Sequence, residues 1–399
     1  MEIQSLRGSV LIITLFMVSV FYLLGISLLL LSFTETTLSD LEVRSMQSLY
    51  LAESALAEGL AKLRTNPDYR TDLNDTLPIG TNVGLYSVKF YDGTNDGNGY
   101  YRPALSPFLY QIILAGKGTV PGFRTSAQAE IEAEVALKPF VMLSEESLDI
   151  RDGSVIQGNI HANQQVTLSP GSTVTGNVTT SGSLTNQGTV TGVISFLEPS
   201  IRLPVLTTQP YYPMYTYQGT TYSAQKLTPV SVPLPNPPGN PPPYPNIELY
   251  QGTTSSGNPA GVYYLDEPVT ASLVQIDLTG TLILLPSAGD LNISGVVRIT
   301  PVGSFPAILS SRHLQIRMMG NLSSFGITGN LIQGLIYTDG DITLIGEDLS
   351  GRVVEGMLIA HQITTQGIPN LQINYTSSIL SNPPPDLDLI EVLSWKQKE

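Results

Sequence analysis

The chain begins with a long apolar stretch. Residues 9–33 contain no charged side chain and consist mainly of Leu, Ile, Val, Phe and Met. This run of about 25 residues exceeds the roughly 20 that a helix needs to cross a bilayer. A secretory signal peptide has a shorter apolar core, of about 7 to 15 residues, followed by a small-residue cleavage site that is absent here. The pattern therefore predicts a transmembrane helix that signal peptidase does not remove.

The helical pattern continues beyond the apolar stretch, over residues 34–66. Apolar or small side chains recur every three or four positions, as on one face of a helix, at Leu38, Leu41, Ser45, Leu49, Ala52, Leu56, Leu60 and Leu63. Pro67 lacks an amide donor and disfavours helix in the residue before it, so the helix is predicted to end near Asn66. We expect this stripe to pack against protein, because a simple anchor needs only the first half of such a helix.

Charges on either side of the apolar stretch predict its orientation. Arg7 precedes it, whereas Glu35, Asp40 and Glu42 follow it. Because positive residues stay on the cytoplasmic side, residues 1–8 are expected to be a short cytoplasmic leader. The chain is then a single-pass protein of the inner (cytoplasmic) membrane with a periplasmic or extracellular ectodomain.

Strands are predicted next, in residues 67–139. Apolar and polar positions alternate in 84–91, 110–117 and 125–137, as on a half-buried antiparallel sheet. Between the first two strands, Asp92 to Gly99 combines acids, amides and glycines that suit calcium, but no bidentate acid closes the loop. The same residue types make hairpin turns, which is the interpretation we favour, with no metal site.

Short apolar segments separated by Gly, Ser, Thr and Asn fill residues 140–197 and return in 263–399. Three similar segments, about 16 to 18 residues apart as in the coils of a β-helix, are 154–160, 172–178 and 188–194. Two later segments, about 22 residues apart, are 334–342 and 356–363. A single coil cannot bury its apolar face, so stacked coils are expected, forming a β-solenoid.

Proline dominates the segment between these stretches, residues 198–262. Since proline cannot donate to a β-ladder, we expect a linker or an extended strap over the solenoid flank. Several tyrosines of this segment could either stack on sugars or pack the strap against its own protein, and we favour packing for Tyr211, Tyr212, Tyr215, Tyr217 and Tyr222.

Composition narrows the chemistry. A net charge of −14 with 19 Lys and Arg argues against a nucleic-acid partner, which requires clustered positive charge. The absence of cysteine excludes disulfides, thiolate zinc sites and cysteine nucleophiles. Charged residues make up only 13% of the chain, with 36 Gly and 29 Pro, a mixture typical of strands and turns.

Solenoids also host polysaccharide-cleaving enzymes, whose chemistry needs convergent carboxylates. The best candidates are Asp339 and Asp341, with Glu347, Asp348 and Arg352 nearby. Asp339 and Asp341 lie in the sequence Thr-Asp-Gly-Asp, which is also typical of an ordinary turn, and acidic turns are expected in a chain of this net charge. His161, His313 and His361 are isolated in sequence, and no catalytic or phosphate-binding motif is present. We predict no enzyme activity, no catalytic residue and no cofactor.

Two N-terminal segments carry a family resemblance. Leu6 to Ile13 reads LRGSVLII, and Gln47 to Ala57 reads QSLYLAESALA. With the apolar stretch between them, they resemble the N-terminal domain of PilX-type minor pilins and the K-type minor pseudopilins of type II secretion. The resemblance covers roughly the first 65 residues. The YxIxLxGxG pattern from Tyr110 resembles minor pilin globular regions more weakly.

The resemblance implies processing, partners and a fold. A prepilin peptidase would cut between Gly8 and Ser9, and the stripe Leu38, Leu41, Leu49, Ala52, Leu56, Leu60 and Leu63 would pack the helix. Other pilin-like subunits would be the partners. Most pilins carry Glu at the fifth mature position, where this chain has Ile13, a departure shared by many PilX-type and K-type proteins.

We therefore expect a mainly β protein with one long N-terminal α-helix, a small pilin-like sheet and a β-helix ectodomain. The leading hypothesis is a non-enzymatic, minor-pilin-like component of a type IV pilus or a type II secretion-like system, used for assembly or adhesion. A membrane-anchored solenoid that binds surface glycan or matrix outside any pilus is the alternative. A membrane-tethered polysaccharide lyase or hydrolase is the third hypothesis.

Overall fold

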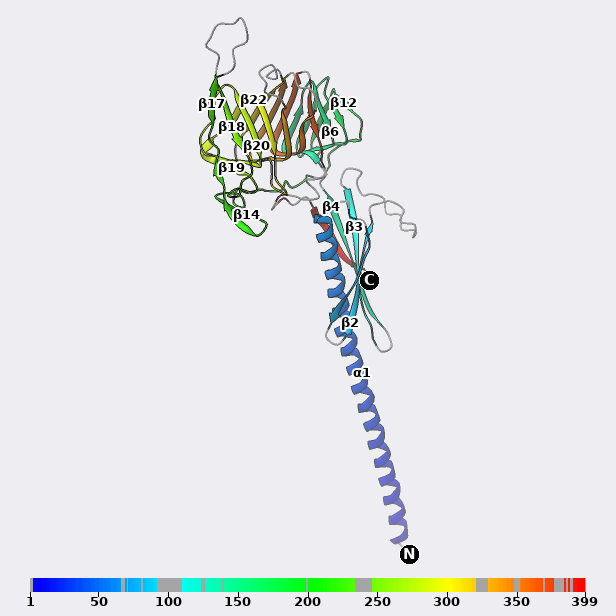
Figure 1. Cartoon of the computed structure of the whole chain (residues 1–399). Coiled ribbons are helices and arrows are strands. Elements are labelled where there is room, and N and C mark those ends of the chain that lie inside the picture. The colour runs from blue at the N-terminus through cyan, green and yellow to red at the C-terminus, as the bar shows by residue number, and fades with distance from the viewer. Residues whose placement is uncertain are drawn as a thin grey trace.

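One long helix leads into two β-rich parts (Figure 1). The computed structural model describes residues 3–65, 69, 71–79, 82–91, 110–122, 126–137, 140–198, 200–233, 246–320, 329–347, 352–368, 370–376, 384, 387 and 390–398. Helix α1 runs from Ile3 to Thr65, so the predicted stop before Pro67 is confirmed. Its Leu11–Arg64 portion is long and apolar enough to be a candidate membrane span or signal sequence, and none of its most apolar window is buried by the described residues.

The apolar half of α1 satisfies its own polar side chains. The hydroxyls of Ser19, Ser27 and Thr34 each donate to the backbone carbonyl four residues earlier, at 2.8 Å. A hydroxyl bonded in this way exposes no unsatisfied donor to an apolar surrounding. These three positions therefore leave no unsatisfied hydroxyl donor on the apolar half of the helix.

The first β part is a five-stranded antiparallel sheet beside the C-terminal half of α1 (Figure 1). In spatial order its strands are β1 (Leu73–Ile79), β2 (Asn82–Tyr91), β3 (Tyr110–Val120), β4 (Ala127–Leu137) and β29 (Ile390–Lys398). The predicted small antiparallel sheet is confirmed. Its fifth strand, β29, comes from the C-terminus and pairs with β4, so the rest of the β-rich chain is inserted between two neighbouring strands.

The second β part is a sheet of 22 strands, here called the parallel stack. Its strands are β5 (Phe140–Ile150), β6 (Ser154–Gln157), β7 (Asn159–Ala162), β8 (Gln165–Leu168), β9 (Thr173–Thr175), β10 (Val178–Thr180), β11 (Ser183–Asn186), β12 (Thr189–Val190), β13 (Ile194–Phe196), β16 (Gln225–Lys226), β17 (Val230–Pro233), β18 (Asn246–Gly252), β19 (Val262–Leu265), β20 (Val274–Thr279), β21 (Thr281–Leu284), β22 (Leu291–Thr300), β23 (Ile308–Ser310), β24 (Leu314–Met319), β25 (Leu331–Thr338), β26 (Asp341–Glu347), β27 (Arg352–Ile368) and β28 (Leu371–Asn374). A 3₁₀ turn, η1, spans Pro286–Ala288.

Pairing in the stack is parallel everywhere except between β17 and β18. Strands β22, β24, β26, β27 and β25 pair in a closed ring, because β22 and β27 each contribute to more than one ladder. Side chains in equivalent positions of paired strands lie next to one another. One such set, here called the apolar column, runs in spatial order through Tyr263, Leu282, Ile308, Ile336, Leu358, Met142, Ile160, Val178 and Ile194.

The order of strands in the stack differs from their order in the chain. β5 pairs with β7 of its own stretch and, on its other side, with β27, near the end of the chain. From β5 the first stretch continues to β13 at one end of the stack (Figure 1). The chain then reappears at the opposite end, at β16, and returns to β27 and β28. The two repeat-bearing stretches thus form one stack, joined at a seam where Met142 pairs with Leu358.

The connection between the two ends packs along the outside of the stack. Ile201 and Leu206 are buried in a hydrophobic cluster on the outside of the stack. Leu227, further along the connection, is buried in the interior core. Tyr211 and Tyr215 are fully buried, each edge-on to the ring of Phe305. This is the packing role expected of the proline-rich strap. Its hairpin is formed by β14 (Met214–Tyr217) and β15 (Thr220–Ser223).

Candidate functional site: the face of the long helix and a histidine–carboxylate row

The helix packs on the sheet through a face that begins at Ser48. Five apolar side chains of this face are buried against β2, β3 and β4, namely Leu51, Ala52, Ala55, Leu56 and Leu63. Close approach is possible because β3 presents glycine to the helix: a Cβ added at Gly116 would lie 2.6 Å from the carbonyl oxygen of Ala52. The helix and sheet therefore form one tightly packed unit.

The predicted packing stripe divides into two parts. Ala52, Leu56 and Leu63 are buried, and Leu49 and Leu60 pack partly buried at the edge of the same cluster. The other two members lie nearer the N-terminus and belong to no core cluster: Leu38 is 61% exposed and Leu41 is 43% exposed. Within the described chain, this N-terminal part of the stripe packs against no buried cluster.

Two buried helix positions were missed by the three-and-four spacing. Leu51 and Ala55 are 2% and 0% exposed and lie beside the predicted stripe. A helix on a sheet buries a wider face than a single row. The small side chains of the Ala-Glu-Ser-Ala segment were the available signal, because a helix can approach a sheet closely only where its residues are small.

The suspected processing residues, Gly8 and Ser9, lie near the start of α1. Their side chains are outside the described part of the structure. The acidic turn from Asp92 to Gly99, for which a calcium site was the rejected alternative, also lies outside the described residues.

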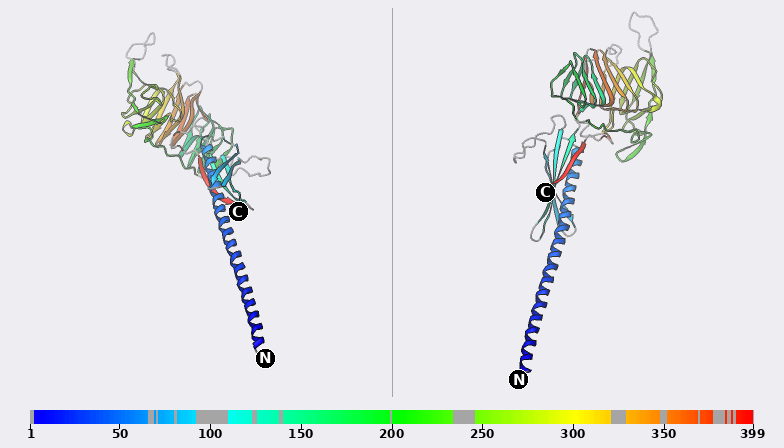
Figure 2. Two further views of the ribbon diagram at one scale, coloured as in Figure 1. Left: turned by 60° about the horizontal axis from the view of Figure 1, so that its bottom comes forward. Right: turned by 180° about the vertical axis from the view of Figure 1, so that it is seen from behind.

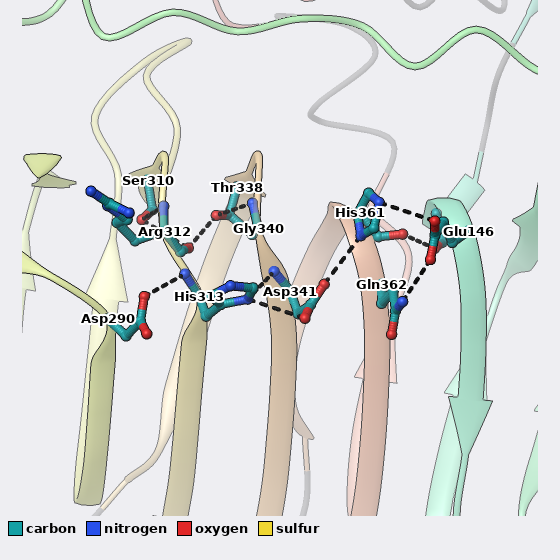
Figure 3. Close-up of polar contacts among 11 residues, drawn as sticks. Glu146, Asp290, Ser310, Arg312, His313, Thr338, Gly340, Asp341, His361 and Gln362 are labelled. Carbon is teal, nitrogen blue, oxygen red and sulfur yellow. Dashed lines mark hydrogen bonds and ion pairs between the residues drawn. The ribbon is translucent and has the colours of Figure 1, made fainter.

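A row of alternating histidines and carboxylates crosses one edge of the stack (Figure 3). It joins Glu146 of β5, His361 of β27, Asp341 of β26, and His313 and Asp290, which precede β24 and β22. Nε2 of His361 lies 3.3 Å from Oε1 of Glu146, and Nδ1 of the same ring lies 3.4 Å from Oδ1 of Asp341. Parallel pairing brings these residues together, since each occupies a similar position in neighbouring coils.

The contact between His313 and Asp341 depends on the proton of the imidazole. The backbone N–H of Asp341 donates to Nδ1 of His313 at 3.0 Å, which requires that nitrogen to be unprotonated. The carboxylate Oδ2 of Asp341 lies 3.1 Å from the same nitrogen, a contact that is attractive only when the nitrogen carries a proton. Nδ1 of His313 can therefore either accept a hydrogen bond from the backbone N–H of Asp341 or donate one to its carboxylate, but not both at once.

The row crosses the seam of the stack. Glu146 belongs to the first repeat stretch, whereas His361 and Asp341 belong to the second. Glu146 also accepts a 2.7 Å hydrogen bond from Nε2 of Gln362. These side chains are about a third or more exposed, so each pair contributes roughly 0–1 kcal/mol. The row therefore helps to hold β5 in register with β27 at the seam, but it adds little to the free energy of folding.

The two aspartates considered for catalysis have different surroundings. Asp339 accepts a hydrogen bond from the hydroxyl of Tyr337 at 2.8 Å, and burial together with this bond raises the pKa of Tyr337. Asp341 belongs to the row, and Glu347 pairs with Arg317 at 3.0 Å.

The remaining catalytic candidates, Asp348 and the side chain of Arg352, lie outside the described residues. Over the described part of the chain, no group of three or more His, Asp or Glu side chains has metal-binding geometry.

The third histidine has a structural environment. His161 is buried between coils, with Nδ1 2.8 Å from the hydroxyl of Thr179 and Nε2 3.0 Å from Oδ1 of Asn163. Burial lowers the pKa of His161, which keeps the ring neutral. Asn163 in turn binds both the N–H and the carbonyl of Ile201 in the strap. His161 therefore orients the residue that fixes the start of the strap.

Comparison with known proteins finds no matching family model, no matching curated protein and no matching solved structure. What the fold defines is a mainly β protein carried on one long, apolar N-terminal helix.

Proposed function

We propose that the chain is a non-enzymatic, minor-pilin-like component of a type IV pilus or a type II secretion-like machine. In this proposal the parallel stack is a β-solenoid that serves assembly or adhesion. The main supporting observation is that the two halves of α1 have different surroundings. Its C-terminal part, from Ser48, packs on an antiparallel sheet, while its N-terminal part is apolar and bare.

The unpacked middle of the helix supports a partner other than lipid. If residues 11–33 span the bilayer, residues 34–47 extend about 20 Å further at 1.5 Å per residue. This section still exposes large apolar side chains, including Leu38, Val43 and Met46, at 61%, 51% and 55%. A tether that meets only solvent would not need large apolar side chains there. Neighbouring helices of pilin-like subunits would cover these side chains.

The pairing of the stack supports the solenoid part of the proposal. Its ladders are parallel, and equivalent apolar residues form the apolar column through successive coils. The recurrent glycines stack as well, since a Cβ at Gly176 would collide with the carbonyl of Gly158. A stack of this kind is a rigid, elongated body, which suits display outside the membrane.

The two other hypotheses have less support. Glycan binding by the strap would use exposed aromatic rings, yet Tyr211 and Tyr215 are buried against Phe305. A polysaccharide-cleaving enzyme would direct its two carboxylates at one bond, whereas Asp339 and Asp341 have separate partners. Both observations favour an assembly role.

Processing provides the first test. Mass spectrometry of the chain extracted from membranes of its native host should give a mature N-terminus at Ser9. A Gly8→Val variant should stay full-length, because a branched side chain blocks access to the bond. The matched control is Gly25→Val in the same helix, where an added Cβ meets nothing within 4 Å; it should be cut normally.

An intact Met1 in the native host would contradict pilin processing. Location gives a second, independent readout: the processed chain should appear in sheared surface filaments as well as in membranes. A chain found only in membranes, with an intact N-terminus, would instead favour the membrane-anchored solenoid.

A further inference from the structure

The two ends of the parallel stack are finished differently. At the β16 end, β17 covers β18 in an antiparallel pair, and β16 covers β19. The apolar column is closed there because Tyr263 pairs with Gln225 of β16. Pro233 lies in β17, where its missing N–H discourages further pairing. This end has the protection expected of a terminal sheet edge.

The opposite end, formed by β11, β12 and β13, has no such cover in the described chain. Each of these strands pairs on one side only, with β8, β9 and β10 respectively. The column ends in Ile194, which is 39% exposed. Its neighbours are more exposed still: Val193 at 49%, Phe196 at 62% and Leu197 at 74%. We call this surface the open end.

Charge sets the open end apart from the rest of the molecule. Residues 153–197 contain no Asp, Glu, Lys or Arg, although the chain carries a net charge of −14. Residues 181–197 also contain no proline. Solenoids and sheets usually guard a terminal edge with charge, proline or a bulge. The first charged residue after this stretch, Glu198, accepts a hydrogen bond from the hydroxyl of Ser195 in β13. An end whose strands carry no charge and no proline and expose apolar side chains is suited to contact with a second apolar surface.

We propose that the open end binds the open end of a second copy of this chain, with the terminal strands of the two stacks facing each other about a two-fold axis. A two-fold contact places identical surfaces together, so an acidic protein forms one with least repulsion where the facing strands carry no charge. Two copies of the open end also have the same outline. When they face each other, the apolar column of one stack can therefore meet the apolar column of the other.

The position of the open end agrees with this arrangement. The stack lies across the end of α1 rather than continuing along it, and the β12 end points sideways (Figures 1 and 2). A two-fold axis parallel to α1 therefore brings two open ends together while both helices point the same way. Two copies anchored in one membrane can make the contact. The inference requires no pilus and stands or falls separately from the proposed function.

Cysteine cross-linking tests the contact in membranes. The chain has no cysteine, so each introduced thiol is unique. In a two-fold contact the residue nearest the axis faces its own copy, and a disulfide needs roughly 4.4–6.8 Å between the two Cα atoms. Of Ile194→Cys, Ser195→Cys and Phe196→Cys, at least one should give a covalent dimer on oxidation. Thr221→Cys, on the exposed hairpin strand β15, is the control and should remain monomeric.

The mass of the detergent-solubilised full chain gives the second readout. We expect twice the 43.0 kDa of one chain. An Ile194→Lys, Thr189→Lys double variant should weaken the dimer by about 10-fold or more, because each lysine meets like charge across the axis. Val230→Lys in β17, at the covered end, should leave the mass unchanged. Both sites are exposed, and circular dichroism checks that the fold is retained.

A wild-type chain with the mass of one copy at micromolar concentration overturns the proposal. So does a dimer that persists unchanged in the double lysine variant, since the contact must then be made by α1 or another surface. Equal cross-linking at Thr221→Cys and at the open end also counts against it, because it indicates random collision.

Discussion

Gly118 of β3 lies against the backbone carbonyl of Ser48 in α1, so closely that a Cβ at Gly118 would collide with that oxygen. The helix enters the sheet at this point. Gly116, two residues earlier on the same face of β3, makes the equivalent approach to Ala52. Two glycines thus determine how deeply the helix sits on the sheet.

Gly118→Ala is expected to destabilise the chain by about 3 kcal/mol, because backbone rather than a movable side chain opposes the new methyl group. The measurement is thermal or denaturant unfolding of the full chain in detergent. Gly257→Ala is the matched control, since nothing lies within 4 Å of its Cβ. If the two variants lose the same amount of unfolding free energy, Gly118 does not lie against the carbonyl of Ser48 as described.

Met142→Ala is expected to destabilise the stack by about 2–5 kcal/mol. Met142 is fully buried in the apolar column and pairs with Leu358 across the seam, so its truncation leaves a cavity where the two repeat stretches meet. Met214→Ala removes the same atoms from a side chain that is 52% exposed, and should change stability by less than about 0.5 kcal/mol. Similar values for both would mean that the first stretch does not stack on the second.

The sequence predicted the elements whose signals are local. Pro67 marks the end of α1, and the alternation of 125–137 marks β4. The repeated glycines were recognised from spacing, and their reason is steric, because Gly176 stacks on the carbonyl of Gly158. Contacts between distant segments carried no such signal. The pairing of β29 with β4 and that of Met142 with Leu358 join residues more than 200 positions apart.

The same limit applies to the candidate site. His161, His313 and His361 appeared isolated because only stacking brings His313 and His361 to Asp341. Parallel coils convert a separation of about 20 residues into direct contact. The sequence also could not show that the helix stripe divides into a buried and an exposed part. Leu38 and Leu56 occupy equivalent positions in the stripe, and only their distance from the sheet makes one exposed and the other buried.

Alkaline pH should weaken the contact between α1 and β2 through Tyr86. Its hydroxyl donates a 2.7 Å hydrogen bond to Glu58 of α1, and this bond, followed by burial, raises the pKa of Tyr86 to about 12. The unfolded chain ionises tyrosine near pH 10. The stabilisation is therefore complete below about pH 10 and is lost as pH rises toward 12.

Tyr86→Phe isolates this contribution from the other tyrosines. The difference in unfolding free energy between wild type and variant should be constant from pH 7 to 9 and shrink between about pH 10 and 12. A difference that stays constant up to pH 12 would show that Tyr86 does not hold its proton through Glu58.

The exposed part of the helix stripe gives the last prediction. A Leu38→Asn, Leu41→Asn double variant should fold normally, since neither side chain contacts the sheet cluster in the described structure. If neighbouring helices cover these residues, losing two apolar contacts of about 1.5–3 kcal/mol each should reduce the amount in sheared filaments at least 10-fold. Tyr50→Asn, at a 66% exposed position outside the stripe, is the control and should assemble normally. Equal assembly of both variants would exclude Leu38 and Leu41 from the proposed interface.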